Sequence, residues 1–230
     1  MEPSTSVTIE GRSYTLTGNV FALADAESFF NSQGMQLDLF GLFLAEYNTE
    51  RVISATRDLF PCMMHPHHPD IDFAAAQALI NRTYAAGDPV IFEAVLKLCR
   101  AAHVDQDHDR ELVFDLEGLA DANDHFEGKS GISWICFVDG LTPLDKASRV
   151  FPCALHRSRP ELTLDQARAM MNWKSVAYTI ACMQELEKAS SHEAMQKFAA
   201  RLWATANDAE RERFTFQVIA KEMAPGAAQA

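Results

Sequence analysis

Two blocks of this sequence occur twice, in the same order, and this internal duplication limits the possible folds more than any other feature. The longer block, from Phe60 to Asn81, returns 91 positions later, from Phe151 to Asn172. Both copies begin with Phe-Pro-Cys and carry a histidine three residues after the cysteine. The shorter block, ALADAESFF at 22–30, returns as GLADANDHF at 118–126. Because two copies of one unit fold alike, the sequence predicts two tandem repeats in one chain.

The first repeat is predicted to begin with a β-hairpin. Residues 7–16, VTIEGRSYTL, place alternating apolar residues on both sides of a Glu10-Gly11 turn, which is typical of two short antiparallel strands. In the second repeat only ELVF, residues 111–114, is plausible as a strand. We therefore expect the second hairpin to be degraded or lost.

Capping residues indicate where the helices of each repeat begin. Asn19 and Asp115 precede segments whose apolar residues recur at helical spacing. A longer helix is predicted from residues 48–49 in the first repeat. In the second repeat its counterpart follows Thr142 and Pro143, a favourable pair for the N-cap and first position. Both long helices are expected to end in the Phe-Pro-Cys-x-x-His stretch.

The residues after that stretch predict another helix in each repeat. Asp72 is an N-cap for a helix over 73–86, and Thr163 is one for a helix over 164–173. Gln166, three residues after Thr163, completes a capping box. The remaining predicted elements are two buried apolar helices (37–47 and 132–141), the closing helices of the repeats (89–103 and 175–189), one or two C-terminal helices (192–205 and 208–223) and a frayed tail (224–230). Residues 213–220, RFTFQVIA, alternate as in a strand, so the last element is either a helix or a strand.

These elements define a mainly α protein. We predict two tandem helical repeats with a small N-terminal β-hairpin and extra C-terminal helices. The first repeat occupies residues 1–104 and the second occupies 105–190, beginning with the acidic linker DQDHDRE at 105–111. Residues 191–230 form a helical extension that ends in the frayed tail.

The bulk composition excludes several classes of protein. The 230 residues carry a net charge of −12, whereas nucleic-acid binding needs a basic surface. No apolar run approaches the length of a membrane span, and the N-terminus lacks the pattern of a signal peptide. The five cysteines are scattered and odd in number, which is typical of reduced, mostly buried thiols in a cytosolic protein. We expect a cytoplasmic protein that binds neither nucleic acid nor membrane.

The repeated Cys and His residues allow three interpretations. In the first, each pair lies at the end of a helix, where the cysteine is a small buried group and the histidine faces the helix C-terminal dipole. In the second, a pseudo-two-fold axis brings four residues together as a Cys₂His₂ zinc site. Those residues are Cys62, His65, Cys153 and His156. The third interpretation is a Cys/His nucleophile, but neither cysteine has a local signature of one.

No catalytic motif accompanies these residues. The sequence contains no P-loop, no GxGxxG, no GxSxG and no HExxH. We therefore expect no enzymatic activity, no catalytic residues and no cofactor. The aromatic residues at helical spacing are predicted to lie in the core; they are Trp134, Phe137, Trp173 and Trp203.

The repeat unit resembles the small tail assembly chaperones of tailed phages and gene transfer agents. The matching features are Gly11, Tyr14 and Leu16 of the hairpin, Leu23 of the first helix, and the His-Pro-Asp run at 68–72. The second repeat keeps Pro-Glu-Leu-Thr at 160–163. The resemblance covers about residues 7–86 and, less well, 112–172. It implies a helical, non-enzymatic cytoplasmic protein of the bacterial host that coats the apolar tape-measure protein or another tail protein during assembly, and it implies no catalytic residues.

A protein that masks an apolar partner needs apolar residues between its helices. The segments at 35–47 and 131–141 are apolar on more than one face, which is typical of a fully buried helix or of a partner surface. The predicted partner-binding residues are Leu39, Phe40, Phe43, Trp134 and Phe137. These residues border a groove or a subunit interface of a homo-oligomer, or else they form the seam between the two repeats.

Two alternative functions remain. One is a structural or accessory phage protein, including an inhibitor of host defence, and the other is a Cys/His metalloprotein.

Overall fold

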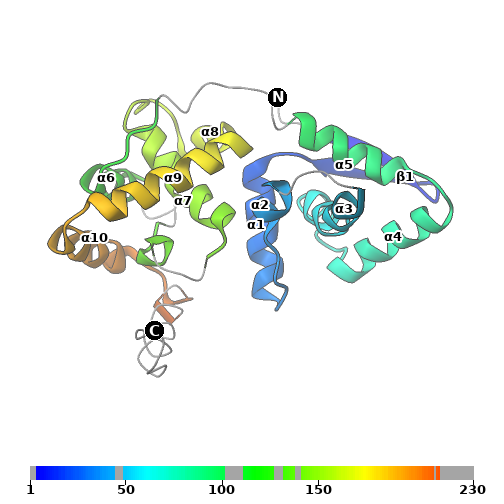
Figure 1. Cartoon of the computed structure of the whole chain (residues 1–230), viewed down its shortest axis with the longest axis horizontal. Helices are drawn as coiled ribbons and strands as arrows, with labels where there is room; N and C mark the ends of the chain where they lie inside the picture. The colour runs from blue at the N-terminus through cyan, green and yellow to red at the C-terminus, as the bar shows by residue number, and fades with distance from the viewer. Residues whose placement is uncertain are drawn as a thin grey trace.

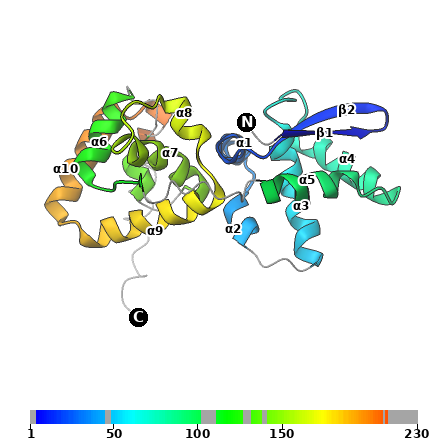
Figure 2. The ribbon, with the colours of Figure 1, turned by 90° about the horizontal axis from the view of Figure 1, so that it is seen from above.

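The structure is a computed structural model and describes residues 4–44, 49–101, 111–126, 132–137, 141–209 and 211–212. It is mainly helical with one small antiparallel sheet, as the sequence predicts (Figure 1). The helices of the first repeat and those of the second form two groups that lie side by side. Figure 2 shows α1 at the boundary between the two groups. None of the described helices is long and apolar enough to cross a membrane.

The N-terminal hairpin consists of β1 (Ser4–Ile9) and β2 (Arg12–Thr17). The strands are antiparallel, with Val7 opposite Tyr14. At the turn, Glu10 and Gly11 have positive φ angles of 52° and 78°, the combination that a two-residue hairpin requires. One face of the hairpin is buried because β1 packs on α5 and β2 packs on α3. This confirms the predicted hairpin and its turn.

The helices of the two repeats follow one another in the same order. In the first repeat they are α1 (Val20–Ser32), α2 (Leu39–Leu44), α3 (Thr49–Met64), α4 (Phe73–Ala85) and α5 (Val90–Ala101). In the second they are α6 (Leu116–His125), the 3-10 helix η2 (Trp134–Phe137), α7 (Pro143–His156), α8 (Leu164–Ala169) and α9 (Trp173–Ala189). The extension adds α10 (His192–Thr205).

Equivalent residues cap the equivalent helices. The Asn19 side chain accepts a hydrogen bond from the backbone N–H of Ala22, and Asp115, 96 positions later, accepts one from Gly118. Asp72 and Thr163 cap α4 and α8 in the same way, and Thr163 forms the predicted capping box with Gln166. The shared caps place the start of each helix at the same position of the repeat.

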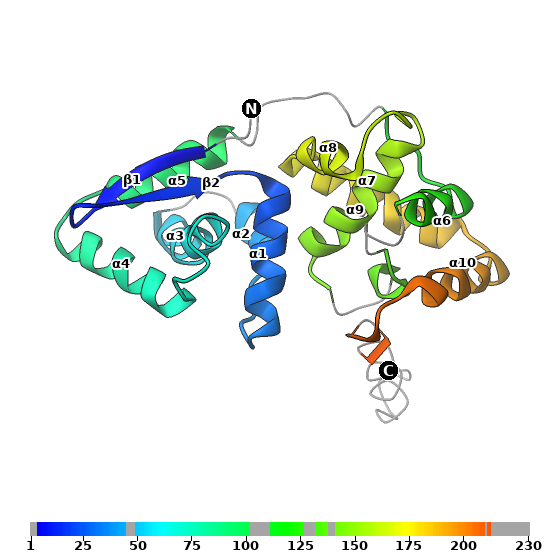
Figure 3. The ribbon, with the colours of Figure 1, turned by 180° about the vertical axis from the view of Figure 1, so that it is seen from behind.

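The long helices α3 and α7 form the centres of the two repeats. Phe60 and Cys62 of α3 are fully buried, and so are Phe151 and Cys153 of α7. Pro61 and Pro152 lie inside these helices, near their C-terminal ends, as predicted. The duplicated Phe-Pro-Cys sequence is therefore the innermost part of each repeat. The view from behind in Figure 3 shows α3 and α7 each surrounded by the other helices of their own repeat.

Four predicted elements differ in the structure. Residues 111–114, the candidate strand of the second repeat, are not a strand; Glu111 is a 3-10 residue, and the chain leads from there to α6. Within their described residues, the apolar segment 37–47 forms a helix only over Leu39–Leu44, and 132–141 forms only the 3-10 turn η2. The predicted helix 164–173 ends at Ala169. Of the predicted helix 208–223, residues 208–209 and 211–212 are helical, whereas 213–223 and the tail lie outside the described residues.

A new cap and a buried side chain explain why α8 is short. The Asn172 side chain accepts a hydrogen bond of 2.9 Å from the backbone N–H of Ser175, so Asn172 is the N-cap of α9 instead of the end of α8. Trp173, the first residue of α9, is buried. A new cap and a buried tryptophan therefore break the chain into two helices at this point.

Candidate interaction surface

The two repeats contact each other through α1 and α7, and a buried glutamate lies at this contact. Glu27 of α1 is fully buried. Its Oε2 accepts a hydrogen bond of 2.6 Å from the backbone N–H of Leu39, and its Oε1 accepts one from the Thr142 hydroxyl. The Thr142 oxygen also accepts a hydrogen bond of 3.2 Å from the backbone N–H of Asp145, which makes Thr142 the N-cap of α7. One carboxylate of the first repeat thus holds the start of the central helix of the second.

The environment of Glu27 favours its neutral form. Burial raises the pKa of this carboxyl to about 7, although the hydrogen bonds from Thr142 and from the Leu39 backbone oppose the shift. The negative charges of Asp38 and Asp145 add to the increase in the pKa. A carboxyl that titrates near neutral pH therefore lies between the repeats.

Two further contacts join the repeats on either side of Glu27. The guanidinium of Arg168 on α8 lies 4.4 Å from the centre of the Phe21 ring on α1, a cation–π contact. Arg168 also lowers the pKa of Asp25, although burial raises that pKa by more. The Phe40 ring of α2 stacks on the Trp173 ring of α9, with centroids 6.5 Å apart. The contact between the repeats thus combines apolar, cationic and hydrogen-bonding groups.

The second repeat uses the equivalent face of α6 to hold α10. Asp121 corresponds to Asp25 and Asn123 corresponds to Glu27, each 96 positions further on. Arg201 of α10 makes ion pairs of 2.7 Å with Asp121 and 2.6 Å with Asp124. Asn123 is fully buried, and its side-chain amide donates a hydrogen bond of 3.5 Å to the Thr205 hydroxyl.

We call this surface the docking face: Asp25 and Glu27 on α1 of the first repeat, and Asp121 and Asn123 on α6 of the second. In each repeat an arginine and a threonine from outside the repeat lie near a polar pair on one helix. In the first repeat the arginine, Arg168, lies over Phe21 and acts on Asp25 through its charge. The partners are Arg168 and Thr142 for the first repeat and Arg201 and Thr205 for the second. The same face of the unit thus binds two unrelated segments.

The docking face was missed by the sequence analysis, although a signal for it was present. Asp25 and Asp121 are identical residues within the repeated block at 22–30 and 118–126. An acidic residue repeated on a helix surface has no role in the core of either repeat, so its repetition indicates a shared contact. Glu27 and Asn123 differ in charge, and their common burial follows only from the fold.

The predicted partner-binding residues are buried where the structure describes their side chains. Leu39 and Phe40 pack at the contact between the repeats. Phe137 is buried beneath α10, with its ring centre 5.1 Å from that of Phe198. The side chains of Phe43 and Trp134 lie outside the described part of the structure. Phe40 therefore contributes to the seam between the repeats, and binding of a partner by the five residues stays a prediction.

The other aromatic residues predicted to lie in the core have different environments. Trp173 is buried, whereas Trp203 on α10 is 37% exposed. The prediction was wrong for Trp203 because α10 buries only its opposite side, with Met195, Phe198 and Leu202, against the second repeat. Arg211 lies 5.9 Å from the Trp203 ring.

The duplicated histidines occupy matching aromatic pockets. The His65 ring stacks on Phe29, with centroids 4.4 Å apart, and lies 5.0 Å from Phe30. His156 stacks on His125 at the same centroid distance of 4.4 Å and lies 4.9 Å from Phe126. In both histidines the Nδ1 atom is buried without a hydrogen-bond partner, and burial lowers the pKa of the imidazole.

The structure does not bring together the four residues of the predicted Cys₂His₂ zinc site. Among the described residues, no group of three or more His, Cys, Asp or Glu side chains is placed to hold a metal ion. Each imidazole packs on rings of its own repeat instead of meeting the residues of the other repeat. The five cysteines, all within the described residues, form no disulfide, and four are buried, as predicted; Cys182 is partly exposed. Burial raises the pKa of the Cys62 thiol, which disfavours the thiolate that a metal or a nucleophilic role requires.

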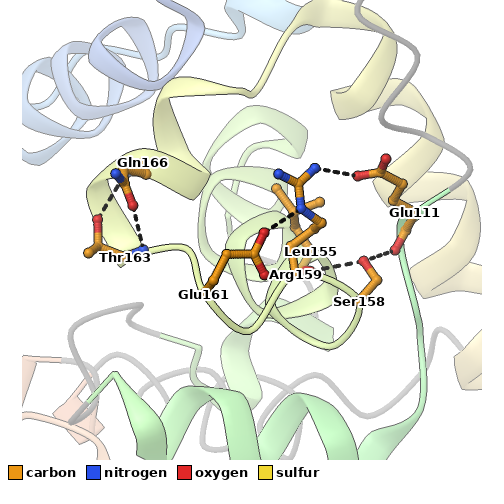
Figure 4. Close-up of polar contacts among 7 residues, drawn as sticks. All are labelled: Glu111, Leu155, Ser158, Arg159, Glu161, Thr163 and Gln166. Atoms are coloured by element: carbon orange, nitrogen blue, oxygen red, sulfur yellow. Dashed lines mark hydrogen bonds and ion pairs between the residues drawn. The ribbon is translucent and has the colours of Figure 1, made fainter.

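The lost hairpin of the second repeat is replaced by polar contacts of the chain at 111–115. In the first repeat the backbone N–H of Thr15 donates a hydrogen bond of 2.9 Å to Nε2 of His68. At the equivalent positions of the second repeat, Glu111 pairs with Arg159 at 3.2 Å (Figure 4). Arg159 also pairs with Glu161 at 2.6 Å. The loop before α8 is thus held by side chains where the first repeat uses a strand.

Comparisons of this chain with protein-family models, with curated proteins and with solved structures find no match.

Proposed function

We propose that this chain is a non-enzymatic helix-binding protein that acts in the bacterial cytoplasm as a tail assembly chaperone, binding an apolar helical partner such as a tape-measure protein. The observation that carries the proposal is the repeated use of the docking face. In one chain, this face binds α7 and α8 in the first repeat and α10 in the second. A unit that engages different helices through equivalent positions of one helix is suited to binding helices of another protein.

The charge of the chain is consistent with this function. A net charge of −12 keeps a complex with an apolar partner soluble, because like-charged complexes repel one another. The hairpin at 4–17 and the capped helix after Asp72 belong to the unit that resembles the tail assembly chaperones. Both features are consistent with a chaperone that keeps an apolar helical partner soluble.

Co-expression tests the proposal. A tape-measure protein, the long, apolar, helical partner that the proposal names, is expressed alone, with this chain, or with an unrelated protein of the same net charge. We expect the long protein to stay soluble and to co-purify with this chain, and to be insoluble in the other two cases. If it is equally insoluble in all three, or equally soluble with the unrelated acidic protein, the proposed function is wrong.

A further inference from the structure

The helix α10 occupies the docking face of the second repeat with one of its sides. Met195, Phe198 and Leu202 are its buried residues. Arg201 and Thr205 lie on the same side and contact Asp121, Asp124 and Asn123 of α6. Counted from Met195 as i, the contacts are apolar at i, i+3 and i+7, cationic at i+6 and a hydroxyl at i+10.

We propose that the docking face of the second repeat, together with Phe137 of η2, is a binding site for an amphipathic helix of another protein, and that α10 fills this site until that helix displaces it. The proposal rests on the proposed function and names the surface and the partner chemistry. The partner helix carries apolar residues at i, i+3 and i+7 with an arginine at i+6. The arginine of such a helix forms ion pairs with Asp121 and Asp124, and its apolar residues cover Phe137, as those of α10 do.

The position of α10 makes it displaceable. It lies beside α6 at the outer end of the second repeat, away from the first repeat (Figures 1 and 3). Only Ser190 and Ser191 join it to α9, and both have extended backbone angles. A change of angles at these two residues moves α10 without unfolding α9.

The polar contacts of the two docking faces differ in their exposure to solvent. Glu27 and its hydrogen bonds are buried between the repeats. The side chains of Arg201 and Asp124 are 38% and 39% exposed, so their ion pair is screened by water and contributes little to affinity. The charges therefore set the register of the bound helix, and the apolar residues supply most of the binding.

A peptide of residues 190–207, labelled with fluorescein, tests the proposal by fluorescence anisotropy. In the wild-type chain the tethered α10 competes at high effective concentration. In the full-length variant Arg201→Glu the tethered helix faces two carboxylates, and this repulsion weakens its hold on the site, although its apolar contacts are unchanged. We expect the peptide to bind Arg201→Glu at least about tenfold more tightly than wild type. Equal binding to both chains, or binding to neither, overturns the proposal.

A reversed pair of charges provides the matched control. The full-length double variant Asp121→Arg with Asp124→Arg is tested with the wild-type peptide and with a peptide carrying Arg201→Glu. We expect this chain to bind the Arg201→Glu peptide and to reject the wild-type peptide. If the wild-type peptide binds it as well as it binds the Arg201→Glu chain, the peptide does not use the docking face and the proposal is wrong.

Hydrogen exchange of the wild-type chain gives a test that needs no variant. We expect the amides of α10 to exchange by local opening, well before those of α7. If α10 and α7 exchange together in a single unfolding event, α10 is a fixed part of the fold and the proposal is overturned. A concentration-dependent dimer that exchanges α10, and that the peptide dissociates, overturns it too, because the occupant is then a second copy of this chain.

These outcomes are distinguishable from failure of the proposed function. If the co-expressed partner is kept soluble but no chain binds the peptide, the chaperone function stands and this site is wrong. If the peptide binds as expected but the partner stays insoluble, the docking face binds helices and the proposed function is wrong.

Discussion

Glu27 and Thr142 are hydrogen-bonded across 115 positions of the chain, and this bond joins the first repeat to the start of the central helix of the second. Thr142 therefore has two functions, since it caps α7 and also satisfies a buried carboxylate. The equivalent pair in the second repeat, Asn123 and Thr205, joins that repeat to α10. In both repeats a threonine from outside the repeat forms a hydrogen bond with the buried polar side chain, Glu27 on α1 or Asn123 on α6.

We expect Thr142→Ala to destabilise the protein by about 2–4 kcal/mol, because it removes a helix cap worth about 1 kcal/mol and leaves Glu27 without one of its buried hydrogen bonds. Urea unfolding at pH 8 measures this loss. Thr163→Ala removes an exposed cap only and is expected to cost about 1 kcal/mol, and Thr142→Ser keeps both hydrogen bonds. If the two alanine variants lose equal stability, the bond to Glu27 contributes nothing.

The buried Glu27 predicts a specific dependence of stability on pH. Its pKa is raised to about 7 in the fold, from an ordinary value of 4.5, so the folded chain binds more protons than the unfolded chain between these two values. The contribution of Glu27 to the free energy of unfolding therefore decreases as the pH rises from 4.5 to 7, by up to about 3 kcal/mol, and is constant above that range.

The variant Glu27→Gln isolates this contribution, because an amide has the same shape and does not titrate. The stability difference between Glu27→Gln and wild type is expected to grow in favour of the variant as the pH rises from 4.5 to 8. Glu193→Gln, an equivalent change on the exposed side of α10, controls for the loss of one carboxylate. A difference that stays constant with pH shows that Glu27 does not titrate between the repeats.

Local signals predicted the parts of the fold that depend on neighbouring residues. The hairpin turn at Glu10-Gly11 and the caps at Asp72 and Thr163 were predictable because the backbone groups they satisfy lie within a few positions. The partner of Glu27 was not predictable, because it lies on the other repeat. A glutamate in a helix is usually exposed, and only the packing of α1 against α7 buries this one.

The pair Asn81 and Asn172 shows the limit of sequence identity between the repeats. The two residues are equivalent in the duplication, yet Asn81 lies inside α4 whereas Asn172 caps α9. The next residue explains the difference. Trp173 is buried against Phe40, whereas Arg82 is exposed and pairs with Glu10 of the hairpin. Tertiary contacts, which the sequence did not indicate, therefore decide where the helix ends.

The stacked histidines predict a loss of stability in acid. The pKa values of His65 and His156 are lowered in the fold, so the unfolded chain binds more protons as the pH falls through 6.5. The contribution of the two histidines to the free energy of unfolding is therefore largest above about pH 6.5 and decreases below it. We expect His65→Phe and His156→Phe each to reduce this loss, because phenylalanine keeps the ring packing and cannot be protonated.

Thermal unfolding between pH 5 and 8 measures the effect. The substitution His192→Phe, at an exposed position, is the control. Equal acid sensitivity of all three variants contradicts the prediction.

The burial of the cysteines predicts the order in which they react with iodoacetamide. Cys182 is partly exposed, whereas Cys62 and Cys153 are fully buried in the centres of the repeats. Burial also raises the pKa of Cys99 to about 11, which leaves almost none of the reactive thiolate at pH 8. We expect Cys182 to be alkylated first and the four buried thiols to react only when the chain opens, at least about a hundredfold more slowly.

Peptide mapping by mass spectrometry over time identifies each site, and Cys182→Ser should abolish the fast phase. If Cys62 or Cys153 reacts as fast as Cys182 in the folded protein, the Phe-Pro-Cys segments are not the buried centres of the repeats.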